Sequence, residues 1–143
     1  MSLLPLALQA IREGEGSPAY QALSEAAAQG ARPYPYIIAV DFDGTLCENN
    51  WPEIGRENRK MLKVLPLLRK LGVLLVLWSC REEDDLADAV EWCRERGVEF
   101  DAANEKSLKL LLKRGALQQA HYLLMRCLHL QKKHPYFLNR MHS

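Results

Sequence analysis

The side chains best suited to chemistry are those of two aspartates, Asp41 and Asp43. Asp41 directly follows the apolar run at residues 36–40, and Asp43 lies two positions later. An apolar run of this length, bounded by polar residues, predicts a buried strand. Because side chains alternate along an extended chain, both carboxylates are expected on the same side. Paired carboxylates suit a hard cation such as Mg²⁺, and a carboxylate can also attack phosphorus or transfer a proton. The alternative interpretation is a polar turn, which an Asp-Gly pair favours.

The pentapeptide at residues 41–45, Asp-Phe-Asp-Gly-Thr, resembles motif I of the haloacid dehalogenase (HAD) superfamily. The resemblance implies that Asp41 is the nucleophile that becomes an aspartyl phosphate and that Asp43 is the general acid and base. It also implies that Asp41 and Asp43 hold Mg²⁺, the latter through its backbone carbonyl. The similarity covers residues 36–105 and looks like the small capless members of the superfamily, a group regarded mostly as phosphatases of unassigned substrate.

A second set of polar residues follows the next apolar run, residues 73–78, which also predicts a buried strand. In the superfamily a Ser or Thr at this place holds the transferring phosphoryl group, and Ser79 matches it. Arg81 is expected to add a charged fork to a phosphate oxygen. The alternatives are that Ser79 caps the following helix and that Arg81 forms a surface ion pair with Asp84 or Asp85.

The resemblance is incomplete toward the C-terminus. Motif III is a lysine that stabilises the phosphoryl charge, and Lys106 is assigned to it as a phosphate-binding residue, with Lys109 as the alternative. Motif IV is a pair of acidic residues after a fourth strand, and it is not found because no Asp or Glu follows Glu105. Asp101 or Glu105 would then have to serve as the replacement metal ligand.

The chain divides by pattern into three segments: a helical lead at 1–35, an HAD-like α/β core at 36–105 and a basic, helical tail at 106–143. Strands and helices alternate within the core, which predicts a parallel sheet with right-handed crossovers. The fold class is therefore α/β, a three-layer HAD-like (Rossmannoid) parallel sheet that is reduced or truncated at the C-terminus. The helical lead is expected to bury little and to carry no chemistry.

The tail differs in charge from the remainder of the chain, since it holds eight basic residues, all four histidines and no acid. Its leucine pattern predicts helices at 108–112 and 117–130 in place of the fourth strand. The tail is either a true replacement that covers the sheet edge or a segment read out of frame. A basic amphipathic tail can bind anionic membranes or nucleic acid, but nucleic acid is not expected here because no recognisable motif is present.

The segment 47–58 is polar and rich in turn-forming residues. It leaves the carboxyl end of the first expected strand, where α/β sheets bind their ligands. Two interpretations remain open: a lid or substrate loop over the site, or a surface loop pinned by Trp51.

Composition limits the remaining possibilities. A chain of 143 residues with 48% apolar and 26% charged residues is typical of one soluble domain. No apolar run approaches the length of a membrane span, and the first residues lack the basic region of a secretory signal. The four cysteines form no CxxC pair, which favours free thiols and a cytoplasmic location.

The sequence therefore predicts a Mg²⁺-dependent phosphatase or phosphotransferase that acts on a small phosphorylated molecule through an aspartyl-phosphate intermediate. The alternative is a catalytically inactive or truncated HAD-like protein that acts as a binding module through its basic tail.

Overall fold

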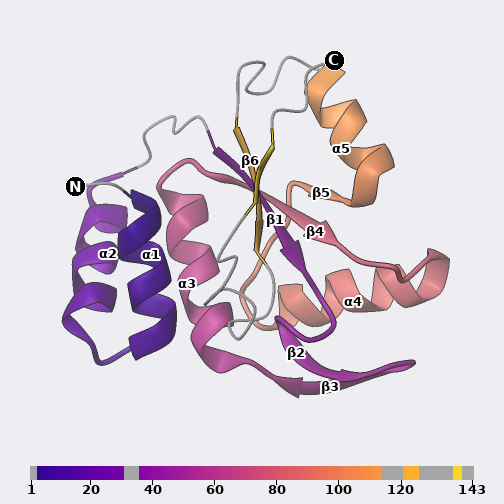
Figure 1. Ribbon diagram of the computed structural model, residues 1–143, viewed down its shortest axis with the longest axis horizontal. Helices are drawn as coiled ribbons and strands as arrows, with labels where there is room; N and C mark the ends of the chain where they lie inside the picture. Colours follow the sequence, from indigo (N-terminus) through magenta and orange to yellow (C-terminus); the bar gives the residue numbers. More distant parts are fainter. Residues whose placement is uncertain (1–2, 31–35, 114–120, 126–136, 140–143) are drawn as a thin grey trace.

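The structure is a computed structural model that describes residues 3–30, 36–113, 121–125 and 137–139. A five-stranded sheet crosses the molecule in the order β5-β4-β1-β6-β7 (Figure 1). β1 (Tyr36–Asp41) pairs in parallel with β4 (Leu74–Trp78) on one side and with β6 (His121–Met125) on the other. β4 pairs in parallel with β5 (Ala102–Ala103), whereas β7 (Phe137–Asn139) runs antiparallel to β6. The predicted α/β class is confirmed, and so are the parallel strands expected at 36–40 and 73–78. The third strand, expected at 98–102, is the short β5 at Ala102–Ala103.

Helices cover the sheet. α3 (Arg59–Lys70) joins β1 to β4 by way of the segment between them, and α4 (Glu83–Glu95) joins β4 to β5. Right-handed crossovers in one direction place both helices on the same face. α5 (Asn104–Lys113) follows β5 and lies on the side of the sheet away from α3 (Figure 1). α1 (Leu3–Glu13) and α2 (Pro18–Ala28) form a helical pair beside α3.

Local signals in the sequence set the starts of these helices. Ser17 precedes α2, and its side chain accepts a hydrogen bond from the backbone N–H of Tyr20. Asn58 precedes α3 and accepts from the N–H of Met61 in the same way. These side chains satisfy amides that have no partner inside the helix. Pro66 lies inside α3, which begins at Arg59.

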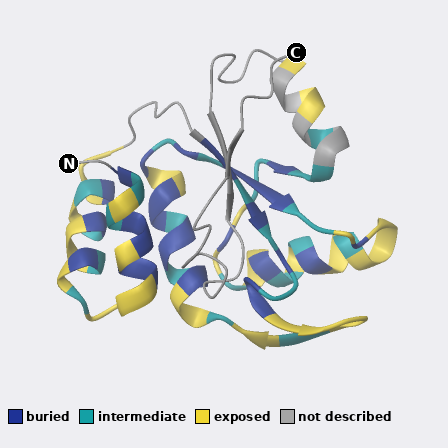
Figure 2. Ribbon diagram, viewed as in Figure 1, coloured by how far each residue is buried: buried dark blue, intermediate teal, exposed yellow. Residues whose placement is uncertain are grey.

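The core follows the alternation of side chains along β1 and β4, which are dark blue along most of their length in Figure 2. The side chains packed with the helices α1 to α4 are Ile38, Val40, Leu75 and Leu77. A smaller cluster on the other face includes Ile37 and Val76. Both faces of the central strands are apolar because both are covered, as is usual for parallel sheets.

The N-terminal helices bury more than the sequence suggested. Ala7 and Ile11 of α1 and Leu23 of α2 are fully buried, and all three belong to the main hydrophobic cluster. The prediction of a weakly packed lead was wrong. Small alanines between the leucines let α1 and α2 approach each other and α3 closely, so the pair joins the core as an outer helical layer.

The predicted helix at 117–130 is wrong where the chain is described, because residues 121–125 form β6 beside β1. The helix expected at 108–112 is confirmed within α5. The open edge of β1 offers a row of unpaired backbone groups, and the short apolar run at 121–125 satisfies them as a strand. So short a run shows no clear helical or strand periodicity of apolar residues, and its sequence alone does not distinguish a strand from a helix. The segments 114–120 and 126–136 lie outside the described residues.

The polar segment after β1 forms a β-hairpin, where the sequence analysis expected a loop without regular structure. β2 (Cys47–Asn50) pairs antiparallel with β3 (Glu53–Glu57). Gly55 is required for this pairing, since a Cβ atom there would lie 2.1 Å from the carbonyl oxygen of Glu48. Trp51 at the turn is 56% exposed, so it does not pin the segment into the core.

No helix among the described residues is long and apolar enough to cross a membrane. Cys47, Cys80 and Cys93 are free thiols, and Cys127 lies outside the described residues. Burial raises the pKa of the Cys93 thiol to about 12. Cys93 therefore acts in the core as a small apolar side chain.

The burial of α2 can be tested by truncating one leucine. Leu23→Ala should lower the free energy of unfolding by about 2–5 kcal/mol, because it leaves a cavity in a fully buried layer. Urea unfolding followed by circular dichroism measures this change. Leu110→Ala is the matched control, since Leu110 is 52% exposed and its truncation should cost less than about 0.5 kcal/mol. Equal losses for the two variants would contradict the packing described for α2.

Candidate active site

The parallel sheet brings two predicted site residues to one edge. Asp41 is the last residue of β1 and lies in register with Trp78, the last residue of β4. Ser79 directly follows Trp78. The carboxyl ends of parallel strands are where ligands of open α/β sheets bind. Asp41 and Ser79 therefore lie at the ends of adjacent strands, on the edge of the sheet where open α/β sheets commonly bind ligands.

The turn after β1 folds the chain back into the hairpin. Gly44 has φ +88°, a backbone conformation that side chains rarely adopt, and its N–H donates to the carbonyl of Cys47 at 2.8 Å. The N–H groups of Thr45 and Leu46 both donate to the carbonyl of Phe42. These bonds leave the Asp43 side chain on a tight turn just beyond the strand.

Asp43 forms a partly buried ion pair with Arg81. The Nε of Arg81 donates to Asp43 Oδ2 at 2.9 Å, and Nη2 donates to Oδ1 at 2.8 Å. The Arg81 side chain is 2% exposed and that of Asp43 is 20% exposed. The pKa of Arg81 is raised above its ordinary value, chiefly by the hydrogen bonds to Asp43 and despite the opposing effect of burial. This two-point geometry is the strongest form of an arginine–carboxylate contact.

Arg81 also contacts the tip of the hairpin. Its Nη1 donates to the carbonyl of Pro52 at 3.0 Å, and Nη2 donates to the carbonyl of Glu53 at 2.8 Å. The guanidinium lies 4.9 Å from the ring of Trp51 and 5.3 Å from that of Phe42. The predicted surface ion pair with Asp84 or Asp85 is wrong, because the described residue that pairs with Arg81 is Asp43. No local pattern indicates this partner, because it lies 38 positions away in the chain.

Ser79 lies in a turn that is stabilised by hydrogen bonds with Asn104. The N–H of Ser79 donates to Asn104 Oδ1 at 2.9 Å, and Asn104 Nδ2 donates to the carbonyl of Arg81 at 3.4 Å. Ser79 Oγ accepts from the N–H of Arg81 at 3.0 Å, which leaves the hydroxyl hydrogen able to donate. The alternative that Ser79 caps the next helix is wrong, since the N-cap of α4 is Glu82.

Asn104 is a site residue that the sequence analysis missed. It follows β5 at the same edge of the sheet, and its φ is +63°. Asparagine tolerates this left-handed conformation better than other residues with a side chain. A polar residue directly after a third parallel strand was the available signal.

Lys106 and Asp101 were also predicted to belong to the site. Lys106 lies in the first turn of α5, and its side chain is outside the described part of the structure. Asp101 accepts hydrogen bonds from the N–H of Leu75 at 2.9 Å and from Arg69 at 3.1 Å. Leu75 lies near the start of β4, so Asp101 is at the opposite edge of the sheet and the prediction that it replaces motif IV is wrong.

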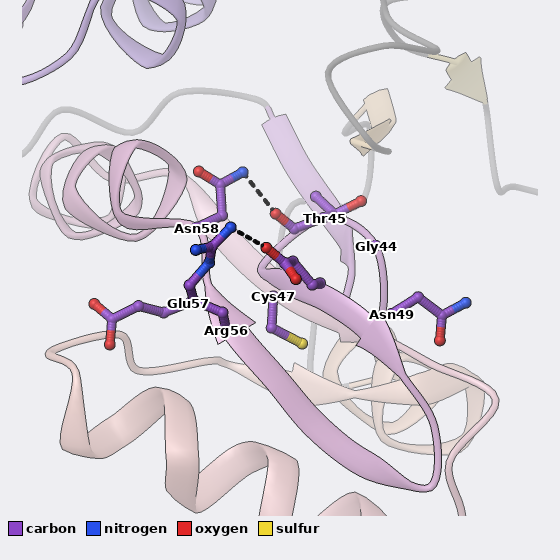
Figure 3. Close-up of a pocket in the computed structure, with 8 residues that line it drawn as sticks. Gly44, Thr45, Cys47, Asn49, Arg56, Glu57 and Asn58 are labelled. Atoms are coloured by element: carbon purple, nitrogen blue, oxygen red, sulfur yellow. Dashed lines mark hydrogen bonds and ion pairs between the residues drawn. The ribbon is translucent and has the colours of Figure 1, made fainter.

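A pocket of about 400 Å³ lies beside the turn at 41–45. It is lined by Gly44, Thr45, Cys47, Glu48, Asn49, Arg56, Glu57 and Asn58 (Figure 3). Figure 3 shows Asn58 reaching toward the backbone of Thr45, whose carbonyl accepts its Nδ2 hydrogen at 2.9 Å. The Oγ1 atom of Thr45 is buried without a hydrogen-bond partner. Since the lining includes neither Asp41 nor Ser79, the pocket borders the candidate site and does not coincide with it.

The comparisons with known proteins give little beyond this geometry. No protein-family model matches the chain, and no curated protein matches it. One similar solved structure is that of a conserved protein coded by a locus of Bacteroides thetaiotaomicron. The match has 51% sequence identity and a TM-score of 0.47, and it covers 48% of this chain and 57% of the other. It assigns neither a family nor an activity.

The role of Asn104 can be tested by two substitutions. Asn104→Gly keeps the left-handed backbone and removes both side-chain hydrogen bonds, which should lower the free energy of unfolding by about 1–3 kcal/mol. Asn104→Ala should cost about 1 kcal/mol more, because alanine is strained at a positive φ. Urea unfolding measures both values, with the exposed Asn50→Ala as the control. An alanine variant as stable as the unsubstituted chain would contradict the assignment.

Proposed function

We propose that the chain is a Mg²⁺-dependent, HAD-like phosphatase or phosphotransferase that acts on a small phosphorylated molecule. The observation that carries the proposal is the meeting of Asp41 and Ser79 at the ends of adjacent parallel strands, with Asp43 fixed just beyond by a buried arginine. A carboxylate nucleophile, a second carboxylate and a hydroxyl donor at one edge are the groups that phosphoryl transfer through an aspartyl phosphate requires.

The strand order supports the HAD-like assignment of the fold. The superfamily resemblance calls for a fourth strand beside the strand of motif I, and β6 occupies that place. The motif I strand is then flanked by the Ser79 strand on one side and by β6 on the other. No acidic residue follows Glu105, so β6 is not followed by the acidic pair of motif IV.

In the proposed reaction a carboxylate oxygen of Asp41 attacks phosphorus, and the bond to the leaving oxygen breaks. Asp43 enters this step in its protonated form and gives its proton to that oxygen, which leaves the carboxylate that Arg81 stabilises. Asp43 then takes a proton from a water molecule or acceptor alcohol, which attacks phosphorus and releases Asp41. The two contacts with Arg81 use one lone pair on each Asp43 oxygen, and a second lone pair on each remains for the proton. Ser79 donates its hydroxyl hydrogen to a phosphoryl oxygen, and Lys106, in the first turn of α5, is the proposed source of positive charge.

The residues present fit a magnesium ion that binds together with the substrate. Asp41 offers a carboxylate and Asp43 a backbone carbonyl, whereas the Asp43 carboxylate is occupied by Arg81. Among the described residues no three His, Cys, Asp or Glu side chains form a metal-binding group. Mg²⁺ commonly binds through one or two carboxylates plus water and substrate phosphate oxygens. When bound, it neutralises charge on the phosphoryl group.

The direct test is hydrolysis of an aryl phosphate with Mg²⁺ and with a chelator. Asp41→Asn should lower the rate by more than about 10³-fold, because it removes the nucleophile. The matched control is Asp88→Asn, an exposed carboxylate on α4, which should keep the full rate. Activity that persists in Asp41→Asn, or that does not change when the chelator is added, would contradict the proposed mechanism.

One observation favours the alternative of a non-catalytic binding module. The two carboxylates of motif I have no acidic partner beyond Glu105, and one of them is already paired with Arg81. Calorimetry with Mg²⁺ and a phosphate mimic separates the two functions. Absence of Mg²⁺ binding with the mimic present would favour a module that binds its partner through the basic tail.

A further inference from the structure

We propose that Arg81 is a positioning residue that couples the tip of the β2–β3 hairpin to Asp43, so that the position of the hairpin tip sets the orientation of the Asp43 carboxylate. The consequence for catalysis rests on the proposed function. The coupling between the hairpin tip and Asp43 is inferred from the contacts of Arg81 alone.

One guanidinium group joins the two parts. Nε and one hydrogen of Nη2 bind the Asp43 carboxylate, while Nη1 and the other hydrogen of Nη2 bind the carbonyls of Pro52 and Glu53. The rings of Phe42, from the turn after β1, and Trp51, from the hairpin tip, lie against the same group. Because the guanidinium is planar and rigid, a displacement of the carbonyls is transmitted to the carboxylate.

The hairpin has few other attachments near its tip. The side chains of Trp51, Pro52 and Glu53 are exposed, and Ile54 is the apolar residue of β3 that packs on the main core. At the base, Glu57 forms an ion pair with Arg96 in which both side chains are about one-third exposed or more. Exposed pairs of this kind contribute little. Within the described part of the chain, the contacts of Arg81 are therefore the main polar link between the tip and the sheet.

The same geometry argues against Arg81 as a direct phosphate ligand. A guanidinium carries five N–H donors, and the four contacts above leave a single one on Nη1. The side chain is also 2% exposed. A phosphate could gain a charged fork only by displacing Asp43 or the hairpin carbonyls. Arg81 accordingly acts on the substrate through Asp43.

The experiment measures hairpin opening by amide hydrogen exchange at residues 48–57. Arg81→Lys keeps the charge but loses the fork, and Asp43→Asn keeps the shape but loses the charge. Each variant should raise the exchange rate in the hairpin by at least about tenfold, with the amides of β4 unchanged. Arg96→Lys is the matched control, since Arg96 also contacts this hairpin and an aromatic ring but lies away from Asp43. It should leave exchange near the tip unchanged.

Kinetics supply the second readout. With an aryl phosphate and Mg²⁺, Arg81→Lys should lower kcat by about 100-fold and leave KM within about threefold, as expected for a misplaced catalytic group. A direct phosphate ligand would instead raise KM. Hairpin exchange that stays the same in both variants overturns the coupling, and so does an equal rise in Arg96→Lys. If Arg81→Lys does not fold, exchange in Asp43→Asn decides alone. A chain without phosphatase activity defeats the proposed function and leaves the exchange test valid.

Discussion

The ion pair between Arg81 and Asp43 is the interaction on which the arrangement at the sheet edge depends. Burying a guanidinium and a carboxylate costs several kcal/mol for each ion, and their attraction offsets this cost only when the geometry is good and the other donors are satisfied. Here both conditions hold, because the carboxylate is bound at two points and two carbonyls take further donors. Apolar residues of similar volume often stabilise a fold as well as a buried ion pair does. The ion pair is therefore better explained by the position that it gives to Asp43.

Three separate stretches of the chain supply this edge, and the parallel sheet is what brings them together. The first is the turn at 41–45, the second is the turn at 79–81, and the third is Asn104 after β5. Each follows the carboxyl end of a strand, so the register of the sheet aligns all three. β6 closes the other side of β1 and makes that strand central. The fold thus keeps a rigid base below the turns, while the hairpin above is held by side-chain contacts.

The sequence was informative where periodicity and local motifs determine structure. The strands at 36–40 and 73–78 and the α/β class follow from apolar runs alternating with helices, and the structure confirms them. The partner of Arg81 could not be predicted, because a contact across 38 positions leaves no local pattern in the sequence. The strand at 121–125 was missed because its neighbour β1, and not its own period, decides its conformation. The hairpin was missed because its strands are polar and exposed and depend on Gly55 for their close pairing.

A double-mutant cycle between Arg81 and Asp43 tests the central claim most directly. The free energy of unfolding would be measured for Arg81→Met, Asp43→Asn and the double variant. Asp43→Asn leaves the buried charge of Arg81 without its partner, which should cost about 3–5 kcal/mol, and Arg81→Met should cost less because Asp43 is partly exposed. We expect the double variant to lose less than the sum of the two, by about 1–3 kcal/mol, because the second change removes the orphaned group. Losses that add to within about 0.5 kcal/mol would show that the two residues act independently and would contradict the account.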